Sequence, residues 1–235
     1  PELALAATTL ERTGHAYACI CTRGDLRALG APQAGQTEVR YPGTCRGRFS
    51  SLDDARRQGH EPGLRFLVEP GNVDFFDENY GDQSFDVAAD VGDFLVQRRN
   101  GTPAYQLAVV CDDAFDEVTH VVRGSDLLPS TARQRLLQRA LGLATTQSFH
   151  VPLVVDATGR RLAKREADLS LSELRERGVD PRAIVGWVAA RSGQSTDADA
   201  RLTASELVRH FDASRVGQQP IVFEPSQIER WLART

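Results

Sequence analysis

The pattern of apolar and polar positions predicts short, mixed elements over the first hundred residues. Residues 17–45 are rich in Gly, Pro, Thr and Cys, which is typical of a loop that holds short strands. Ser51 is placed to cap a short helix, because its side-chain oxygen can accept from a free backbone N–H. Two segments alternate between apolar and polar residues, as half-buried strands do. The expected elements are helices at 2–12 and 53–58 and strands at 64–68 and 94–98.

After residue 100 the apolar positions run together. Near-continuous apolar stretches predict buried strands at 105–111, 120–122 and 151–155, with an amphipathic helix at 131–143. Buried strands that alternate with helices are typical of a parallel sheet in an α/β domain. Beyond residue 169 the pattern becomes helical. The helices expected there lie at 171–177, 181–191, 204–210 and 226–233.

This order of elements predicts the second part of an α/β domain. A Cys-rich insert precedes it and a small helical domain follows it. A parallel sheet needs further strands to cover its edges, so we expect this sheet to be incomplete on its N-terminal side. The chain begins at Pro1 and contains no Met, which also suggests a fragment or a processed product.

Composition and charge narrow the class of protein. Apolar residues make up 41% of the 235 residues, and no apolar run approaches the roughly 20 residues that a membrane span needs. The net charge of −4 argues against a globally basic nucleic-acid-binding protein, although a local basic patch is compatible with it. No secretory signal is visible. We therefore expect a cytoplasmic monomer that does not enter the membrane.

Three of the four cysteines lie near the start of the chain and form the first chemical cluster. Thiolates are preferred ligands of structural zinc, so Cys19, Cys21 and Cys45 favour a metal site over disulfides. The candidates for the fourth ligand are Tyr41, a histidine and water. Chemistry alone favours a histidine, since phenolate is a rare zinc ligand. The alternative is three reduced cysteines without metal. The histidines in question are His15 and His60.

Three further residues are candidates for substrate chemistry. Tyr105 begins one predicted strand and Arg123 ends another, where ligands of α/β sheets bind and a guanidinium can grip a carboxylate. Lys164 is the single lysine among 28 basic residues, and it follows a strand in a basic loop that suits phosphate chemistry. Taken alone, each has a plainer interpretation. These are a core tyrosine, an ion pair of Arg123 with Asp113 or Asp126, and a solvated loop.

The order of four motifs makes the chain resemble the second half of glutamyl-tRNA synthetase catalytic domains. The resemblance is dense between residues 94 and 186. The cysteine pattern, with Tyr41 before Cys45, resembles the zinc site of the shorter glutamyl-queuosine tRNA(Asp) synthetases. The four motifs are residues 119–128 (THVVRGSDLL), Thr131-x-Arg133-Gln134, His150-x-Pro152-Leu153 and residues 161–165 (RLAKR).

The resemblance implies roles for individual residues. Tyr41 becomes the fourth zinc ligand beside Cys19, Cys21 and Cys45, in place of the histidine that chemistry alone favoured. Tyr105 and Arg123 match positions that bind the glutamate substrate. Lys164 matches the ATP-contacting, catalytic lysine of a KMSKS-type loop.

The resemblance also implies a fold and an activity. The fold is an incomplete Rossmann-like class I synthetase catalytic domain, with a zinc-containing insert and a small C-terminal helical domain. The enzyme is an ATP-dependent ligase that activates glutamate, with Mg²⁺ accompanying ATP and Zn²⁺ as structural cofactor. It then transfers glutamate to queuosine of tRNA(Asp). The implied domains are 1–93 (end of the first catalytic half with the insert), 94–168 (second half) and 169–235 (helical domain).

Two departures from the family qualify this interpretation. Ala163 stands where the KMSKS-type loop usually has a hydroxyl, and the HIGH-type motif precedes the point where this chain begins. We therefore expect the 235-residue chain alone not to form glutamyl-adenylate. Two alternatives stay open. One is a fragment of an ordinary glutamyl-tRNA synthetase, and the other is a non-catalytic, zinc-stabilised tRNA-binding module.

Overall fold

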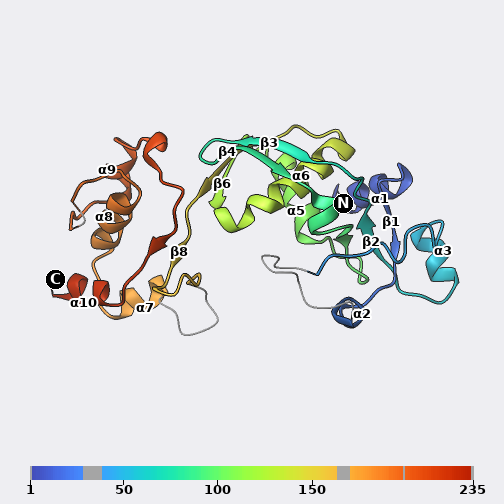
Figure 1. Cartoon of the computed structure of the whole chain (residues 1–235), viewed down its shortest axis with the longest axis horizontal. Coiled ribbons are helices and arrows are strands. Elements are labelled where there is room, and N and C mark those ends of the chain that lie inside the picture. The colour runs from blue at the N-terminus through green and yellow to red at the C-terminus, as the bar shows by residue number, and fades with distance from the viewer. Residues whose placement is uncertain (1, 29–38, 163–169, 198, 234–235) are drawn as a thin grey trace. The chain divides into compact units, whose positions relative to one another are not determined.

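The computed structural model describes residues 2–28, 39–162, 170–197 and 199–233. These residues divide into two units, which are described separately (Figure 1). Unit 1 comprises residues up to 77 together with 82–121 and 128–148, and unit 2 comprises 78–81, 122–127 and 149 onward.

Unit 1 contains a three-stranded antiparallel sheet in the order β1-β2-β5. The strands are β1 (Ala16–Cys19), β2 (Gly63–Phe66) and β5 (Phe94–Gln97). Because side chains alternate along a strand, one face of β2 sends apolar residues into the core while the other carries Arg65. The remaining short elements of this region are α2 (Arg23–Ala28), α3 (Leu52–Arg57), β3 (Val73–Asp77), β4 (Gly81–Phe85) and α4 (Val87–Asp90).

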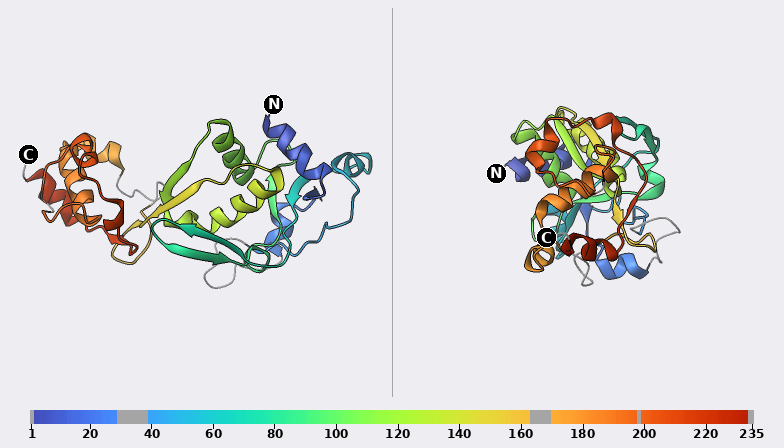
Figure 2. Two further views of the ribbon diagram at one scale, coloured as in Figure 1. Left: turned by 90° about the horizontal axis from the view of Figure 1, so that it is seen from above. Right: turned by 90° about the vertical axis from the view of Figure 1, so that its left-hand side faces the viewer.

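Three helices complete the core of unit 1. Helices α1 (Glu2–Arg12), α5 (Tyr105–Phe115) and α6 (Leu128–Leu141) pack against one another and against the strands (Figures 1 and 2). The side chains of Leu10 and Leu107 are fully buried at this junction. Burying such a side chain contributes about 1.5–3 kcal/mol, so apolar packing holds the helices to the sheet.

The strand predicted at 105–111 is wrong, because residues Tyr105–Phe115 form helix α5. The apolar run Leu107–Cys111 also fits a helix. Leu107 and Val110 are buried one turn apart, while the residues between them are only partly covered. A short apolar run does not distinguish a buried strand from a buried helix face. The predicted parallel sheet loses one strand with this correction, and the three-stranded sheet of unit 1 is antiparallel.

The strand–helix–strand order after α5 is confirmed. Strand β6 (His120–Gly124) pairs with β7 (Gln147–Val151), and α6 lies between them in sequence. The predicted run 151–155 divides between the end of β7 and the short strand β8 (Val154–Val155). The fold is therefore a mixture of helices and sheets, as expected.

Unit 2 holds the C-terminal helices. Their core is an aromatic group in which Trp187, Phe223 and Trp231 meet with centroid separations of 5.6 to 6.1 Å. Strand β8 pairs with β9 in parallel. The elements are α7 (Leu171–Glu176), α8 (Pro181–Arg191), α9 (Ala204–Val208), β9 (Ile221–Val222) and α10 (Ser226–Leu232), with short 3-10 turns at Ser125–Leu127 and Ala213–Arg215.

The helix ends follow the capping residues in the sequence. Ser51 caps α3 by accepting from Asp54 N, as predicted. Helix α8 begins at Pro181, with Asp180 as its N-cap, and ends at Arg191 as expected. None of the helices in the described ranges is both long and apolar enough to span a bilayer.

Candidate metal centre and active-site residues

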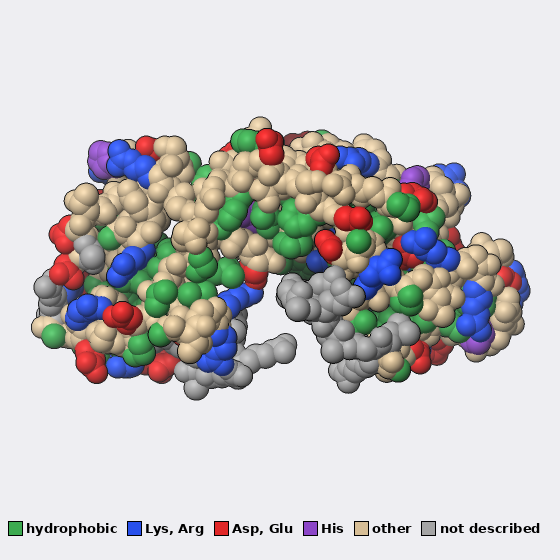
Figure 3. Space-filling view, viewed as in Figure 1, with side chains coloured by type: hydrophobic (Ala, Val, Ile, Leu, Met, Phe, Trp, Pro, Cys, Tyr) green, Lys and Arg blue, Asp and Glu red, His purple; other side chains and the backbone are tan. Residues whose placement is uncertain are grey.

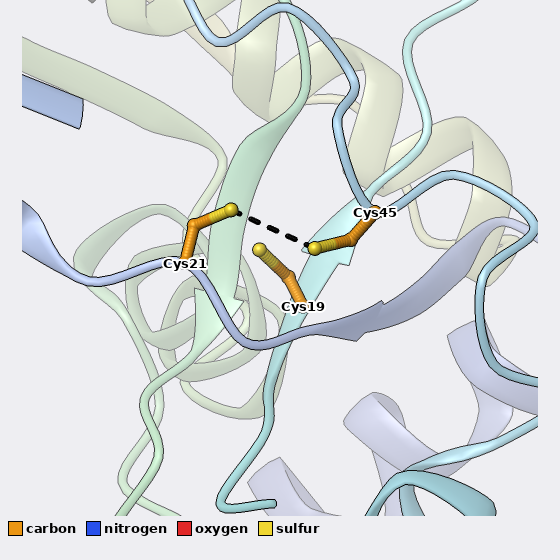
Figure 4. A group of neighbouring side chains, drawn as sticks. All are labelled: Cys19, Cys21 and Cys45. Atoms are coloured by element: carbon orange, nitrogen blue, oxygen red, sulfur yellow. Dashed lines mark hydrogen bonds between the residues drawn. The ribbon is translucent and has the colours of Figure 1, made fainter. Parts of the chain in front are cut away.

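The structure brings three cysteines together in unit 1. Cys19 ends β1, Cys21 lies two residues further, and Cys45 follows the turn at Gly43. Their sulfur atoms all lie within 4.8 Å of one another, with Cys21 Sγ 3.6 Å from Cys45 Sγ. Figure 4 shows the three side chains pointing toward a common centre. Metal binding is the chemistry that this grouping suits, since all four cysteines of the chain are free thiols.

The Tyr41 phenol is the fourth polar group at this centre. Its oxygen lies 3.4 Å from Cys19 Sγ and 3.6 Å from Cys21 Sγ, and it accepts from Cys45 N at 3.0 Å. The two histidines considered as alternatives have other contacts. His15 Nδ1 lies 2.9 Å from Thr13 Oγ1, and the His60 ring meets Phe49 edge-on. We call Cys19, Cys21, Cys45 and Tyr41 the Cys–Tyr cluster.

The distances in the Cys–Tyr cluster fit zinc. A tetrahedral site with Zn–S bonds of about 2.3 Å and a Zn–O bond of about 2.0 Å separates its sulfurs by about 3.8 Å and oxygen from sulfur by about 3.5 Å. The sulfur–sulfur distance of 3.6 Å and the oxygen–sulfur distances of 3.4 and 3.6 Å lie close to these values. The donor set thus has the chemistry of a four-coordinate zinc site, and these three distances agree with its spacing.

Burial and hydrogen bonding shift the pKa values of this cluster. Burial raises the pKa of Cys21 to about 11, with the neighbouring cysteines adding to the effect. Burial and hydrogen bonds to the cysteines likewise raise the pKa of Tyr41. Burial alone would also raise the pKa of Cys45. Hydrogen bonds from the Ile20 backbone and from Tyr41 outweigh it and hold that pKa below its usual value. Metal binding must therefore release protons from some of these groups.

Gly92 lets the backbone of Tyr41 come close to the segment just before strand β5. Tyr41 N donates to Val91 O at 2.9 Å, and Gly92 adopts a φ of +70°. A Cβ atom on Gly92 would lie 2.2 Å from Tyr41 O, far inside van der Waals contact. Only glycine fits both the backbone angle and the approach.

Gly92→Ala is expected to lower the free energy of unfolding by about 2 kcal/mol, because it adds a left-handed alanine and a clash with Tyr41. Gly101→Ala is the matched control. Gly101 also has a positive φ, but a Cβ there meets nothing within 4 Å. It should cost only about 1 kcal/mol. Urea denaturation of both variants measures the difference, and equal costs would show that the approach to Tyr41 is unimportant.

Asp93 is the buried anchor next to Gly92. Its carboxylate accepts two bonds from Arg46, at 2.7 and 2.6 Å, and a third from Val68 N at 2.9 Å. The Tyr17 hydroxyl also donates to it. Although burial alone would raise the pKa of Asp93, these donors, with Arg46 the strongest, hold it below its usual value. The carboxylate thereby ties Arg46, beside Cys45, to the residue that precedes strand β5.

A large cavity of about 1140 Å³ opens next to the Cys–Tyr cluster. Cys19, Cys21 and Tyr41 form part of its wall, and Tyr105 forms another part. Tyr105 is 50% exposed, so it is not the core tyrosine that the plainer interpretation suggested. Buried hydrogen bonds hold the residue that follows it: Gln106 donates to Ser130 and accepts from Gln134.

Arg123 lies in unit 2, near the end of β6. It is half-buried, and its Nε donates to Nε2 of the fully buried His150 at 3.1 Å. Asp126, one of the two carboxylates that the sequence offered as a partner for Arg123, makes an ion pair with Arg161. No partner for His150 was predicted, whereas the structure places it where it orients the Arg123 guanidinium.

Tyr105 and Arg123 belong to different units, and each is placed only within its own. Lys164 lies outside the described residues, so its predicted role in the ATP loop stays a prediction. Two polar residues at the centre, Arg65 and Asp93, are missing from the sequence-based candidates. The signal for Arg65 was present, because it is a lone charge between the apolar residues of a predicted strand.

Comparison with known proteins assigns the class. The family model described as tRNA synthetases class I (E and Q), catalytic domain, matches residues 2–230. The glutamate–tRNA synthetase structure from Elizabethkingia anophelis superposes with a TM-score of 0.73 at 21% identity, over 97% of this chain and 53% of that chain, which supports the same fold. The chain belongs to the catalytic-domain family of class I tRNA synthetases for glutamate and glutamine.

Individual relatives fall into two groups within this family. The chain is 41% identical over 220 residues to a glutamyl-Q tRNA(Asp) synthetase from Symbiobacterium thermophilum, covering 92% of this chain and 67% of that protein. It is 38% identical over 226 residues to glutamate–tRNA ligase 1 from Halorhodospira halophila, covering 94% and 47%. The chain thus spans about two thirds of the first protein and about half of the second. The resemblance to glutamyl-queuosine synthetases is confirmed, and these relatives are class I ligases of the aminoacyl-tRNA synthetase kind.

Proposed function

We propose that the protein carrying this chain activates glutamate with ATP and transfers it to queuosine in tRNA(Asp). The observation that carries the proposal is the Cys–Tyr cluster, in which three cysteine sulfurs lie within 4.8 Å of one another and the Tyr41 hydroxyl lies 3.4 and 3.6 Å from two of them. This is the pattern in which the sequence resembles glutamyl-queuosine synthetases. Identity to a protein of that name over 92% of the chain supports the same choice.

Zinc in this cluster has a structural role. Cys19, Cys21, Tyr41 and Cys45 would hold the ion, which would cross-link β1 to the turn that follows residue 41. All four positions are filled by protein atoms, and closed sites of this type stabilise a fold without binding substrate. The segment 1–93 accordingly contains the zinc insert in our domain assignment, with 94–168 as the second catalytic half and 169–235 as the helical domain.

The remaining candidates divide the work of glutamate activation. Arg123 presents a planar guanidinium, fixed at Nε by His150, that suits the carboxylate of glutamate. The resemblance assigns Tyr105 to glutamate binding as well. When ATP and Mg²⁺ are bound, the α-carboxylate of glutamate attacks the α-phosphate and pyrophosphate leaves. Lys164 stabilises the negative charge that develops on the phosphate oxygens.

Acceptor choice tests the proposal. Transfer of radiolabelled glutamate is measured with three acceptors: tRNA(Asp) containing queuosine, the same tRNA without queuosine, and tRNA(Glu). Labelling of the queuosine-containing tRNA alone is expected, because the modified base supplies the acceptor group. Labelling of tRNA(Glu) instead would identify an ordinary glutamate–tRNA ligase.

Tight tRNA binding without adenylate formation, measured on the protein that carries this chain rather than on the 235-residue chain alone, would identify a non-catalytic binding module. The surface gives this alternative little support. Figure 3 shows basic and acidic side chains interspersed on the visible face rather than gathered into one basic field. With the net charge of −4, strong nonspecific binding to phosphates is not expected.

A further inference from the structure

Arg65 is a buried cation beside the Cys–Tyr cluster. It is 7% exposed, and its guanidinium carbon lies 3.9 Å from the centre of the Tyr41 ring. Arg65 Nε donates to Cys19 Sγ at 3.3 Å, and Nη1 donates to the backbone oxygen of Asp93 at 2.9 Å. Among the described residues, no carboxylate side chain pairs with Arg65. The nearby Asp93 carboxylate pairs with Arg46 instead.

The sheet itself directs Arg65 toward the cluster. Arg65 sits opposite Tyr17 in the β1–β2 register, so its side chain shares a face with those of Tyr17 and Cys19. The β2–β5 register shifts between Leu64 and Arg65. Irregularities of this kind often re-aim a side chain next to a functional site. The neighbouring residues Leu64 and Phe66 point into the apolar core.

A buried guanidinium without a carboxylate is costly unless another negative group faces it. Zinc with three thiolates carries a net charge of −1, before any charge on Tyr41 is counted. Arg65 supplies the opposite charge at the sulfur of Cys19 and over the ring of Tyr41. The positive charge of Arg65 therefore suits a metal-loaded cluster, which is negative, better than a cluster of three neutral thiols.

We propose that Arg65 is a positioning residue for the zinc site, which offsets the charge of the thiolate-bound metal and holds Tyr41 in place as the fourth ligand. This inference rests on the proposed zinc site. It predicts that zinc affinity and the electronic environment of Cys19 depend on a residue that is not itself a ligand. Residues that hold metal ligands through hydrogen bonds typically change metal affinity by about 10–100-fold.

The test is a competition titration of zinc against a chelator, using the full chain with Arg65→Met and Arg65→Lys. Arg65→Met keeps the stem but removes the charge, and it should weaken zinc binding by about 10–100-fold. Arg65→Lys keeps the charge but cannot stack on Tyr41 and donate to Cys19 together. It should weaken binding by about tenfold. If Arg65→Met does not fold, Arg65→Lys decides the question.

Cobalt substitution gives a second readout. Loss of the Arg65 donor should shift the thiolate-to-cobalt charge-transfer band, which a purely structural role would leave unchanged. The matched control is Arg98→Met, an exposed arginine on the wall of the same cavity, and wild-type affinity is expected for it.

The outcomes separate the inference from the proposed function. Wild-type chain without one bound zinc would overturn the metal site itself. Stoichiometric zinc in the wild type, with both Arg65 variants binding within twofold of it, would overturn the role of Arg65 alone. An equal loss in Arg98→Met would assign the effect to the general charge of the cavity and would also overturn it.

Discussion

Cys45→Ser is expected to weaken zinc binding by at least about 100-fold, because roughly 10–16 kcal/mol of binding free energy in structural sites is shared among four ligands. The serine oxygen is a poorer ligand than a thiolate and sits further from the ion. Since the site forms only in the folded chain, the loss of metal should also lower the unfolding temperature. A chelator added to the wild type should produce the same shift. Metal content by atomic emission and melting by circular dichroism measure both effects.

Cys111→Ser is the control for this prediction. Cys111 is partly buried and packs against the core of unit 1, outside the Cys–Tyr cluster. Its replacement should leave the zinc content at one ion per chain. Undiminished zinc in the Cys45→Ser variant would refute the assignment of Cys45 as a ligand.

Asp93→Asn is expected to lower the free energy of unfolding by about 3 kcal/mol near neutral pH. The change removes the charge that compensates Arg46 and weakens the acceptor for Tyr17 and Val68 N. Breaking a buried pair from one side costs about 3–5 kcal/mol, and we take the lower end because the Arg46 side chain is 45% exposed and can regain water. Asp53→Asn is the control. Its carboxylate is 75% exposed, so a change within about 0.5 kcal/mol is expected.

The effect of Asp93 should also depend on pH in a definite direction. The folded state lowers the pKa of this carboxyl, so its stabilising contribution is fully present above the unfolded pKa of about 3.9. That contribution is lost as the pH falls below this value through the folded pKa. The difference between wild type and Asp93→Asn should therefore shrink in acid. A difference that grows toward low pH would contradict the charged role of Asp93.

Local signals in the sequence predicted much of the fold. The limits of α8 follow from Pro181 and Arg191, and the cap of α3 follows from Ser51, because both depend on residues close in sequence. The error at α5 arose where an apolar run fits two kinds of element equally. The antiparallel pairing of β1, β2 and β5 was not predicted, since it joins segments about 30 to 50 residues apart.

In the candidate site, too, features that depend on local spacing were predicted and contacts between distant segments were not. Spacing alone brought Cys19, Cys21 and Cys45 forward as ligands, and the structure brings their sulfurs together. The choice of Tyr41 over a histidine as the proposed fourth ligand came from the resemblance, and the structure places the Tyr41 hydroxyl beside two of the sulfurs. Asp93 acts through hydrogen bonds that span 25 to 76 residues, and Arg65 through hydrogen bonds that span 28 to 46. No local pattern contains these partners, although the lone charge of Arg65 within a predicted strand was visible in the sequence.

The path of the chain limits how this protein can be divided. The backbone crosses between the two units five times, and the short stretches 78–81 and 122–127 belong to the later unit although earlier residues surround them. Asn79 donates to the carbonyls of His150 and Gly217, and Arg123 donates to His150. A polypeptide that began at residue 149 would therefore lack the two stretches whose side chains donate hydrogen bonds to the rest of the later unit. We expect such a piece to be expressed as an unstable fragment rather than as an autonomous module.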